Sequence, residues 1–263
     1  MKILLISDIH ANFRALQAVL DFHSDADEIW CLGDIVEFGP CPSECVDLVR
    51  QNCQHVVKGN HDVSYASAES SSVDNIWARE REPTDVAWLL NLPSSLTVAC
   101  DGFSNYLVHA TPQDNLRGIL WPNDEPAKFA DALQIAATDR VFCGHTHMAF
   151  IYEKNGRCLT NPGTVGQPRD GDYRAQCAVI DNGKIQFERV DYDIEALRLD
   201  YSRSSLPDDV KKGWFRYAMQ GVVDQHGLQL GPYFRPIINN GSGSEVCVFS
   251  TTIRQVQTQV LSL

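Results

Sequence analysis

The feature that most constrains the fold of this chain is an alternation of short apolar runs with amphipathic stretches, from the first residues to about residue 145. Residues 2–7, 28–32 and 54–58 have the length and composition of strands. A stretch with helical spacing follows the first run, where Asn12 is placed to cap the helix, and a second helix is predicted at 42–52. This alternation is typical of βαβ units around a largely parallel sheet.

Later in the chain the pattern changes from helices to hairpins. Helices are predicted at 67–82, 83–91 and 123–137, and strands at 96–100, 105–108 and 140–143. Strand pairs then surround two Asn-Gly dipeptides, with 149–154 and 157–160 around residues 155–156, and 175–181 and 184–190 around residues 182–183. Asn-Gly between apolar strands favours a tight hairpin. We therefore expect a second, more antiparallel sheet packed on the first, with helices outside.

The chain is expected to form one principal domain, residues 1–193, with a C-terminal extension, residues 194–263. The extension contains two predicted helices, 194–202 and 207–220, and one strand-like run, 245–252, after a linker at 239–243 that is rich in Asn, Gly and Ser. At 263 residues the chain is long enough for one large core or two modest ones. The sequence indicates no role for the extension.

Charge and hydropathy exclude several classes of protein. The chain has 22 Lys and Arg against 34 Asp and Glu, a formal charge of −12, which excludes a basic surface for non-specific nucleic-acid binding. No stretch approaches the roughly 20 apolar residues of a membrane helix, and the first apolar run is too short for a signal peptide. We expect a cytoplasmic protein with no membrane partner and reduced cysteines. The composition does not decide whether the chain forms a homo-oligomer.

Residue types that bind metals follow five of the predicted strands, in each case at the strand's C-terminal end. In chain order they are Asp8 and His10, Asp34, Asn60 with His61 and Asp62, His109, and His145 with His147. The C-terminal ends of parallel strands meet along one crevice of an open sheet, so these residues are expected to converge. Five of the eight histidines of the chain occupy these positions.

The donor types indicate which metals such a site would bind. Nitrogen and oxygen donors without thiolate suit manganese, iron, cobalt, nickel or zinc, and manganese is our first choice. The candidates include two carboxylates, one amide and five imidazoles, more groups than one ion with an open position takes from protein. The sequence therefore predicts two divalent or trivalent transition-metal ions.

These residues resemble, in order and spacing, the five motifs of the calcineurin-like metallophosphoesterase superfamily. The motifs read Asp8-Ile9-His10, Gly33-Asp34, Gly59-Asn60-His61-Asp62, His109 and Gly144-His145-Thr146-His147. The resemblance covers roughly residues 1 to 190, and Asn161-Pro162-Gly163 is similar to the small prokaryotic phosphodiesterase-type branch. It implies an α/β fold, a four-layer α/β/β/α sandwich with a dinuclear site at the edge of the central sheets.

The resemblance also implies a role for each motif residue. One ion would be held by Asp8, His10, Asp34 and His147, and the other by Asp34, Asn60, His109 and His145, with Asp34 bridging. His61 would be a donor to the phosphoryl or leaving oxygen, and Asp62 would orient His61 by accepting its other N–H.

Two positions depart from the superfamily pattern. Ala11 stands where most members have Gly, and a positive φ there would cost Ala about 1 kcal/mol. The protein-phosphatase and dinucleoside-tetraphosphatase branches carry Asp-Arg-Gly and a Glu where this chain has Glu37-Phe38-Gly39 and Asp62. Arg169 is the best candidate to bind phosphate in place of the missing Arg, with pairing to Asp170 or Asp172 as the alternative.

The resemblance implies a metal-dependent phosphoester hydrolase that acts on a small phosphate ester or a nucleotide. The missing Arg favours phosphodiesters over monoesters. Two alternatives stay open, namely a phosphomonoesterase or nucleotide pyrophosphatase of the same fold, and a catalytically silent metal-binding scaffold for a protein partner.

Overall fold

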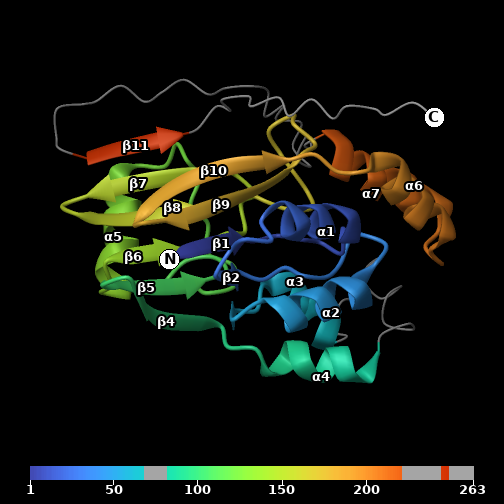
Figure 1. Cartoon of the computed structure of the whole chain (residues 1–263), viewed down its shortest axis with the longest axis horizontal. Helices are drawn as coiled ribbons and strands as arrows, with labels where there is room; N and C mark the ends of the chain where they lie inside the picture. Colours follow the sequence, from blue (N-terminus) through green and yellow to red (C-terminus); the bar gives the residue numbers. More distant parts are fainter. Residues whose placement is uncertain (68–81, 221–243, 249–263) are drawn as a thin grey trace.

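The computed structural model describes residues 1–67, 82–220 and 244–248, and it contains two β-sheets that pack against each other (Figure 1). The strand order is β10-β9-β1-β2-β3 in the first sheet and β11-β7-β8-β6-β5-β4 in the second. Helices cover the outer faces of both sheets. The structure therefore confirms the predicted α/β/β/α sandwich.

The first sheet is built around β1 (Lys2–Ile6). β2 (Glu28–Cys31) lies parallel to β1, and β3 (His55–Val56) lies parallel to β2. On the other side of β1, β9 (Ala175–Asp181) runs antiparallel and forms a hairpin with β10 (Lys184–Val190). The parallel half of this sheet directs the C-terminal ends of β1, β2 and β3 toward the same edge.

The second sheet has a parallel centre and antiparallel edges. Its strands are β4 (Ser95–Cys100), β5 (Phe103–Val108), β6 (Arg140–Phe142), β7 (Phe150–Lys154), β8 (Arg157–Asn161) and β11 (Ser244–Val248). β5, β6 and β8 are parallel neighbours, while β4, β7 and β11 run antiparallel to the strands beside them. The hairpin of β9 and β10 does not join β7 and β8 in one antiparallel sheet, as the sequence suggested. It extends the first sheet instead. β9 is buried along nearly its whole length and pairs with β1 on the side opposite β2.

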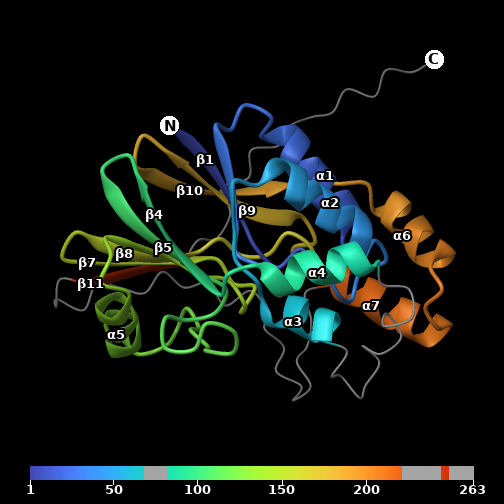
Figure 2. The ribbon, with the colours of Figure 1, turned by 90° about the horizontal axis from the view of Figure 1, so that it is seen from below.

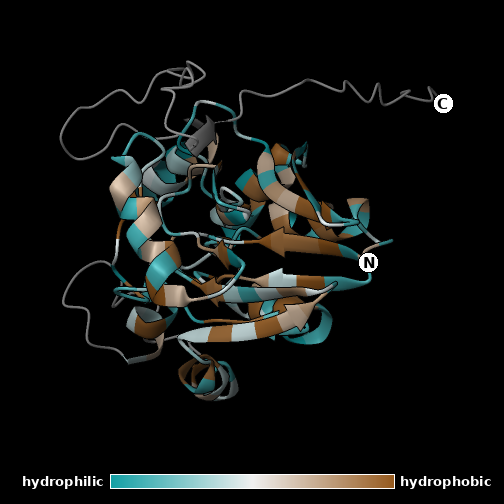
Figure 3. Cartoon of the chain, turned by 90° about the vertical axis from the view of Figure 1, so that its left-hand side faces the viewer, coloured by the Kyte–Doolittle hydropathy of each residue, from teal (hydrophilic) through white to brown (hydrophobic). Residues whose placement is uncertain are grey.

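Alternate residues of β1 enter two different cores. Leu4 and Ile6 point into the core between the first sheet and its helices, whereas Ile3 and Leu5 point into the core between the two sheets, with Phe142 of β6. All four β1 side chains are at most 2% exposed. A strand in the middle of the sandwich is mainly brown, other strands are banded brown, white and teal, and the helices alternate brown and teal (Figure 3).

Three helices form the outer layers as predicted. α1 (Phe13–Phe22) and α2 (Pro42–Asn52) lie on the side of the first sheet, and α5 (Pro126–Ala136) lies on the outer face of the second (Figure 2). The side chain of Asn12 caps α1 by accepting the N–H of Ala15 at 3.1 Å. The N-cap satisfies one of the free N–H groups of the first turn.

Two further helices lie beside each other near the third motif. α3 (Asn60–Ser67) was not predicted as a helix, and its first turn contains the motif residues Asn60, His61 and Asp62. α4 (Pro83–Asn91) was predicted with the same bounds. The helix expected at 67–82 falls mostly on residues 68–81, which lie outside the described residues.

The first part of the C-terminal extension packs on the principal domain. α6 (Ile194–Arg203) and α7 (Asp208–Gln220) bury Tyr201 and Trp214 in the same core as α1 and α2. Arg14 of α1 also forms an ion pair with Asp200 of α6 at 2.6 Å. Among the helices in the described ranges, none has the length and apolar character to cross a bilayer.

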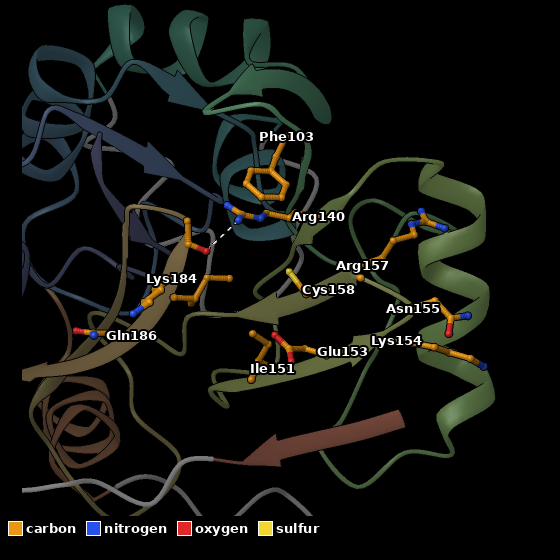
Figure 4. Close-up of a pocket in the computed structure, with 13 residues that line it drawn as sticks. Phe103, Arg140, Ile151, Glu153, Lys154, Asn155, Arg157, Cys158, Lys184 and Gln186 are labelled. Carbon is orange, nitrogen blue, oxygen red and sulfur yellow. Dashed lines mark hydrogen bonds between the residues drawn. The ribbon is translucent and has the colours of Figure 1, made fainter. Parts of the chain in front are cut away.

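The two sheets are also connected at the end of the sandwich where β1 begins. There Arg140 of β6 donates to the carbonyl oxygen of Gly183 in the β9–β10 turn at 2.9 Å, and its guanidinium lies 3.6 Å from the ring centre of Phe103 (Figure 4). A cavity of about 670 Å³ adjoins this contact. It lies at the opposite end of β1 and β6 from the five motifs, so this cavity is separate from them.

Removing a side chain between the sheets tests this architecture. We predict that Leu5→Ala lowers the free energy of unfolding by about 3 kcal/mol, because Leu5 is fully buried and its neighbours cannot fill the space left by the removed atoms. Leu199→Ala is the matched control, since Leu199 is 46% exposed on α6, and it should change stability by less than about 0.5 kcal/mol. Urea unfolding measures both values, and equal losses would contradict the assigned core.

Candidate metal centre and active site

The five motifs come together where strands of both sheets end. Asp8 and His10 follow β1, Asp34 follows β2, and Asn60 to Asp62 follow β3, all in the first sheet. His109 follows β5, and His145 and His147 follow β6, in the second sheet. The open-sheet argument predicted a crevice along one sheet. The site instead lies where the two sheets meet, because β5 and β6 belong to the second, and this is the edge of the central sheets that the resemblance implied.

The loops that carry these residues are tightly wound. Asp8, His10, Ala11 and Asp34 all have positive φ, between 49° and 54°, and His145 and His147 follow at 67° and 61°. Ala11 has the positive φ that the sequence analysis considered, 52°, in the region where Gly is less strained. The loops after β1 and β2 are joined by backbone hydrogen bonds, in which His10 N–H donates to Asp34 O at 2.9 Å and Ala11 N–H to Ile35 O at 2.8 Å. These hydrogen bonds offset the backbone strain of the positive φ values. That backbone conformation directs several side chains of metal-binding types toward the same site.

Asp8, His10 and His147 form the first group that could hold a metal ion. One donor atom from each lies within 4.8 Å of the other two, and all three side chains are at most 2% exposed. The ring of His147 is oriented by its Nδ1–H, which donates to the Gln167 carbonyl at 2.7 Å. Its Nε2 therefore faces His10 Nε2 at 3.1 Å and Asp8 Oδ1 at 3.3 Å. A carbonyl that fixes the tautomer in this way is a common second partner of metal-binding histidines.

Asp34, His109 and His145 form the second group, with donor atoms again within 4.8 Å of one another. His109 Nδ1–H donates to the Leu32 carbonyl at 2.8 Å, which leaves Nε2 for a metal. The Nε2 atom lies 3.2 Å from Asp34 Oδ2 and 3.0 Å from Asn60 Oδ1. The amide oxygen of Asn60 thus lies beside the second group, to which the resemblance assigned it.

Asp34 lies between the two groups. Its Oδ2 is 3.2 Å from His109 Nε2 in the second group and 3.8 Å from His10 Nε2 in the first, while its Oδ1 accepts the N–H of His61 at 2.9 Å. Asp34 Oδ2 and Asp8 Oδ1 are buried and accept no hydrogen bond within the described ranges. A buried carboxylate oxygen without a partner is costly, and bound cations would remove that cost. The donor set therefore fits two ions with Asp34 between them.

The charges in the site are shifted by their neighbours. Burial opposes ionisation of Asp8 and Asp34, but the imidazoles of His147 and His109 outweigh it and lower both carboxyl pKa values. Burial would also lower the pKa of His109, yet the Asp34 carboxylate raises it to about 9. Burial lowers the pKa of His145 to about 4. The carboxylates are thus ionised near pH 7, the form that binds metal.

His61 stands beside the first group without belonging to it. Its ring centre is 5.1 Å from that of His10, and its Nδ1 lies 2.5 Å from Glu37 Oε2. Burial alone would lower the pKa of His61, but the carboxylates of Asp34 and Glu37 raise it to about 9. With Glu37 accepting the Nδ1–H, the Nε2–H of His61 can donate to another oxygen.

Comparison of the sequence with protein families shows to which family the chain belongs. Residues 1–184 match the profile of the calcineurin-like phosphoesterase superfamily domain. The chain belongs to this superfamily. Its members hydrolyse phosphoesters with two metal ions, so the chain is a metal-dependent phosphoester hydrolase.

Individual relatives agree with the superfamily assignment. An uncharacterised protein of Methanocaldococcus jannaschii is 33% identical over 234 residues, covering 78% of this chain and 94% of the relative. The crystal structure of a metallophosphoesterase from Sphaerobacter thermophilus is 30% identical, with a TM-score of 0.73, over 83% of this chain and 99% of that one. A symmetrical bis(5'-nucleosyl)-tetraphosphatase of Erwinia tasmaniensis is 35% identical over 100 residues, only 36% of its length.

Asp62 does not orient His61 in this phosphoesterase, contrary to the sequence prediction. Its carboxylate is fully buried and accepts the backbone N–H groups of Asp34, Ile35 and Gly59, each at 2.8 Å. Asp62 therefore fixes the loops of the second and third motifs relative to each other. Burial and the nearby Asp34 carboxylate raise the pKa of Asp62 to about 7, against the lowering effect of these hydrogen bonds.

Glu37 holds His61 instead, and the sequence analysis did not assign it this role. Its side chain is 2% exposed, and its backbone φ of 69° turns it toward the site. The available signal was its position in Glu37-Phe38-Gly39, where related branches carry an acidic residue. Glu37 replaces Asp62 as the positioning residue for His61.

Arg169 lies close enough to influence the first group. Burial and the positive charge of Arg169 both lower the pKa of His147. Asp170 is paired with Arg189 and Asp172 with Arg174. The positive charge of Arg169 is near enough to His147 to act on an anion there.

A methyl group at Gly59 should disrupt the metal centre of the phosphoesterase. A Cβ at this position would lie 2.0 Å from Asp34 Oδ1 and 2.5 Å from Asp34 N, so we predict that Gly59→Ala displaces Asp34 and weakens Mn²⁺ binding by at least about tenfold. Calorimetric titration of metal-free protein measures the affinity. Gly213→Ala is the control, because no atom lies within 4 Å of a Cβ there. Equal affinities for the two variants would contradict the placement of Asp34.

Proposed function

We propose that Asp34 bridges two metal ions, one held also by Asp8, His10 and His147 and the other by Asn60, His109 and His145. The proposal is supported by the two donor groups and by Asp34 Oδ2, which lies beside donor atoms of both. The donors are nitrogen and oxygen without thiolate, so manganese is the first choice, ahead of iron, zinc, nickel and cobalt.

Two bound ions would supply a water of lowered pKa and neutralise charge on the phosphate. Two divalent ions would carry a total charge of +4, and the two ligand carboxylates carry −2, so the local charge would be about +2. This centre attracts a phosphate ester although the chain as a whole carries −12. Arg169, near His147, adds a further positive charge on the side of the first group.

We assign His61 the role of proton donor to the departing oxygen. Glu37 accepts the Nδ1–H, and the raised pKa keeps a proton on Nε2 near pH 7. In the reaction the water loses one proton to solvent and its oxygen forms a new bond to phosphorus, the ester P–O bond breaks, and the Nε2 proton of His61 goes to the leaving alkoxide. His61 then takes up a proton from solvent. Asp62 supports this arrangement by fixing the loop on which His61 lies.

The substrate class we favour is the phosphodiester, and one observation carries this choice. In the loop after the second motif the ring of Phe38 lies 4.9 Å from the ring of His61. An Arg at this position could bind the extra charge of a phosphomonoester, whereas a phenyl ring cannot. A diester has one charge fewer and an additional organic group.

A second candidate is hydrolysis of a nucleoside polyphosphate. It is favoured by the relative of Erwinia tasmaniensis, which is named a symmetrical bis(5'-nucleosyl)-tetraphosphatase. The alignment covers 35% of this chain and 36% of that relative, so its substrate is a hypothesis for this chain. In either case the two metals and His61 would act on a P–O bond, which is an ester bond in a diester and an anhydride bond in a polyphosphate.

Hydrolysis of paired chromogenic esters tests the proposal. Mn²⁺-loaded protein is expected to cleave bis(p-nitrophenyl) phosphate faster than p-nitrophenyl phosphate. His61→Ala should lower kcat by about 10² to 10⁴ for a diester with an alkoxide leaving group, which needs the proton, and by less for the p-nitrophenyl esters, with metal content unchanged. His55→Ala is the control, because His55 pairs with Glu28 at the start of β3 and is 32% exposed. Faster turnover of the monoester would show that phosphomonoesters, and not phosphodiesters, are the preferred substrate class. No metal-dependent turnover of diesters, monoesters or dinucleoside polyphosphates would favour the silent scaffold instead.

A further inference from the structure

Phe38 links the active site to the C-terminal helices. Its ring centre lies 5.1 Å from that of His10 and 4.9 Å from that of His61, in both cases edge to face. On another side it meets Trp214 of α7 at 5.4 Å, also edge to face. Phe38 is partly exposed, whereas Trp214 is 8% exposed and belongs to the core of the first sheet. A residue of the extension therefore stands directly behind a ring in the site.

The backbone of this loop is strained and is held by α6. Glu37 and Phe38 have φ values of 69° and 65°, and two successive L-residues in this region cost about 1 to 2 kcal/mol each. Such a conformation persists only where the surroundings fix it. The hydroxyl of Tyr201 on α6 donates to the Phe38 carbonyl at 3.1 Å.

The loop also has little space in which to relax toward the first motif. A Cβ at Gly39 would lie 2.2 Å from His10 O and 2.4 Å from the carbonyl carbon of Ala11. The loop is thus confined between the first motif on one side and Tyr201 and Trp214 on the other. The position of Phe38 beside His61 depends on both.

We propose that α6 and α7 hold Phe38 as an apolar wall of the active site, and that this wall selects substrates with an aromatic or bulky apolar ester group. The inference rests on the proposed phosphodiesterase function and specifies its substrate class. A diester places two organic groups around one phosphorus. Since Phe38 packs against both a first-group ligand and the proton donor, an organic group bound beside His61 would meet the ring. An aryl group gains an aromatic contact there, while a methyl group gains little.

Two diesters with the same leaving group isolate this contact. Bis(p-nitrophenyl) phosphate and methyl p-nitrophenyl phosphate both release p-nitrophenolate and differ only in the retained ester group. The wild-type protein should prefer the aryl ester in kcat/KM. Phe38→Ala should lower that preference about three- to tenfold. A general loss of active-site structure would slow both esters equally and leave the ratio unchanged.

The contribution of the helices has its own matched pair. Tyr201→Phe removes only the hydroxyl that donates to Phe38, and Tyr217→Phe removes a hydroxyl from a side chain that is 37% exposed on α7. We expect Tyr201→Phe to lower the aryl preference at least about twofold and Tyr217→Phe to leave it unchanged. Trp214→Leu should act in the same direction as Tyr201→Phe. Should Trp214→Leu fail to fold, Tyr201→Phe, which keeps its ring in the core, decides the question.

The outcomes separate this inference from the proposed function. Absence of metal-dependent turnover of both esters by the wild-type protein would overturn the function and the inference with it. Turnover with an aryl preference that Phe38→Ala leaves intact would overturn the inference alone. A preference lost in Phe38→Ala but retained in Tyr201→Phe and Trp214→Leu would overturn the role given to α6 and α7.

Discussion

The rest of the structure depends on the burial of two ionised carboxylates, Asp8 and Asp34, where the two sheets meet. Each is at most 1% exposed, and removing a carboxylate from water costs several kcal/mol unless opposite charge and hydrogen bonds compensate. Backbone N–H groups of His145 and His61 and the imidazoles around them supply part of this compensation. Two metal ions would supply the rest. The tightly wound loops at the strand ends bring these compensating groups together.

The same constraint connects the outer layers to the chemistry. The loop that carries Glu37 and Phe38 has no regular structure of its own, yet it positions the ring of His61 and borders the site. Its strained backbone is fixed by Tyr201 and Trp214 from helices that follow the matched superfamily domain in sequence. The extension up to the end of α7 thus contributes to the active site through packing.

Much of the fold could be predicted because its signals are local. The Asn-Gly turns, the cap at Asn12 and the polar residues after each strand each depend on a few neighbouring residues. The sheet to which β9 and β10 belong could not be predicted, because pairing with β1 joins segments about 175 residues apart. The resemblance assigned the role of orienting His61 to the next residue, Asp62. In the helical first turn, however, Asp62 points back toward Asp34 and Gly59.

The measurement that tests the central claim most directly is the number and coupling of Mn²⁺ ions bound per chain. Metal-free protein is loaded with Mn²⁺ and analysed by elemental mass spectrometry and electron paramagnetic resonance. Two ions bridged by Asp34 would lie about 3.5 to 4 Å apart and give a spin-coupled spectrum. We predict two coupled ions in the wild-type protein and loss of the coupling in Asp34→Asn. One ion per chain, or two uncoupled ions, would contradict this prediction.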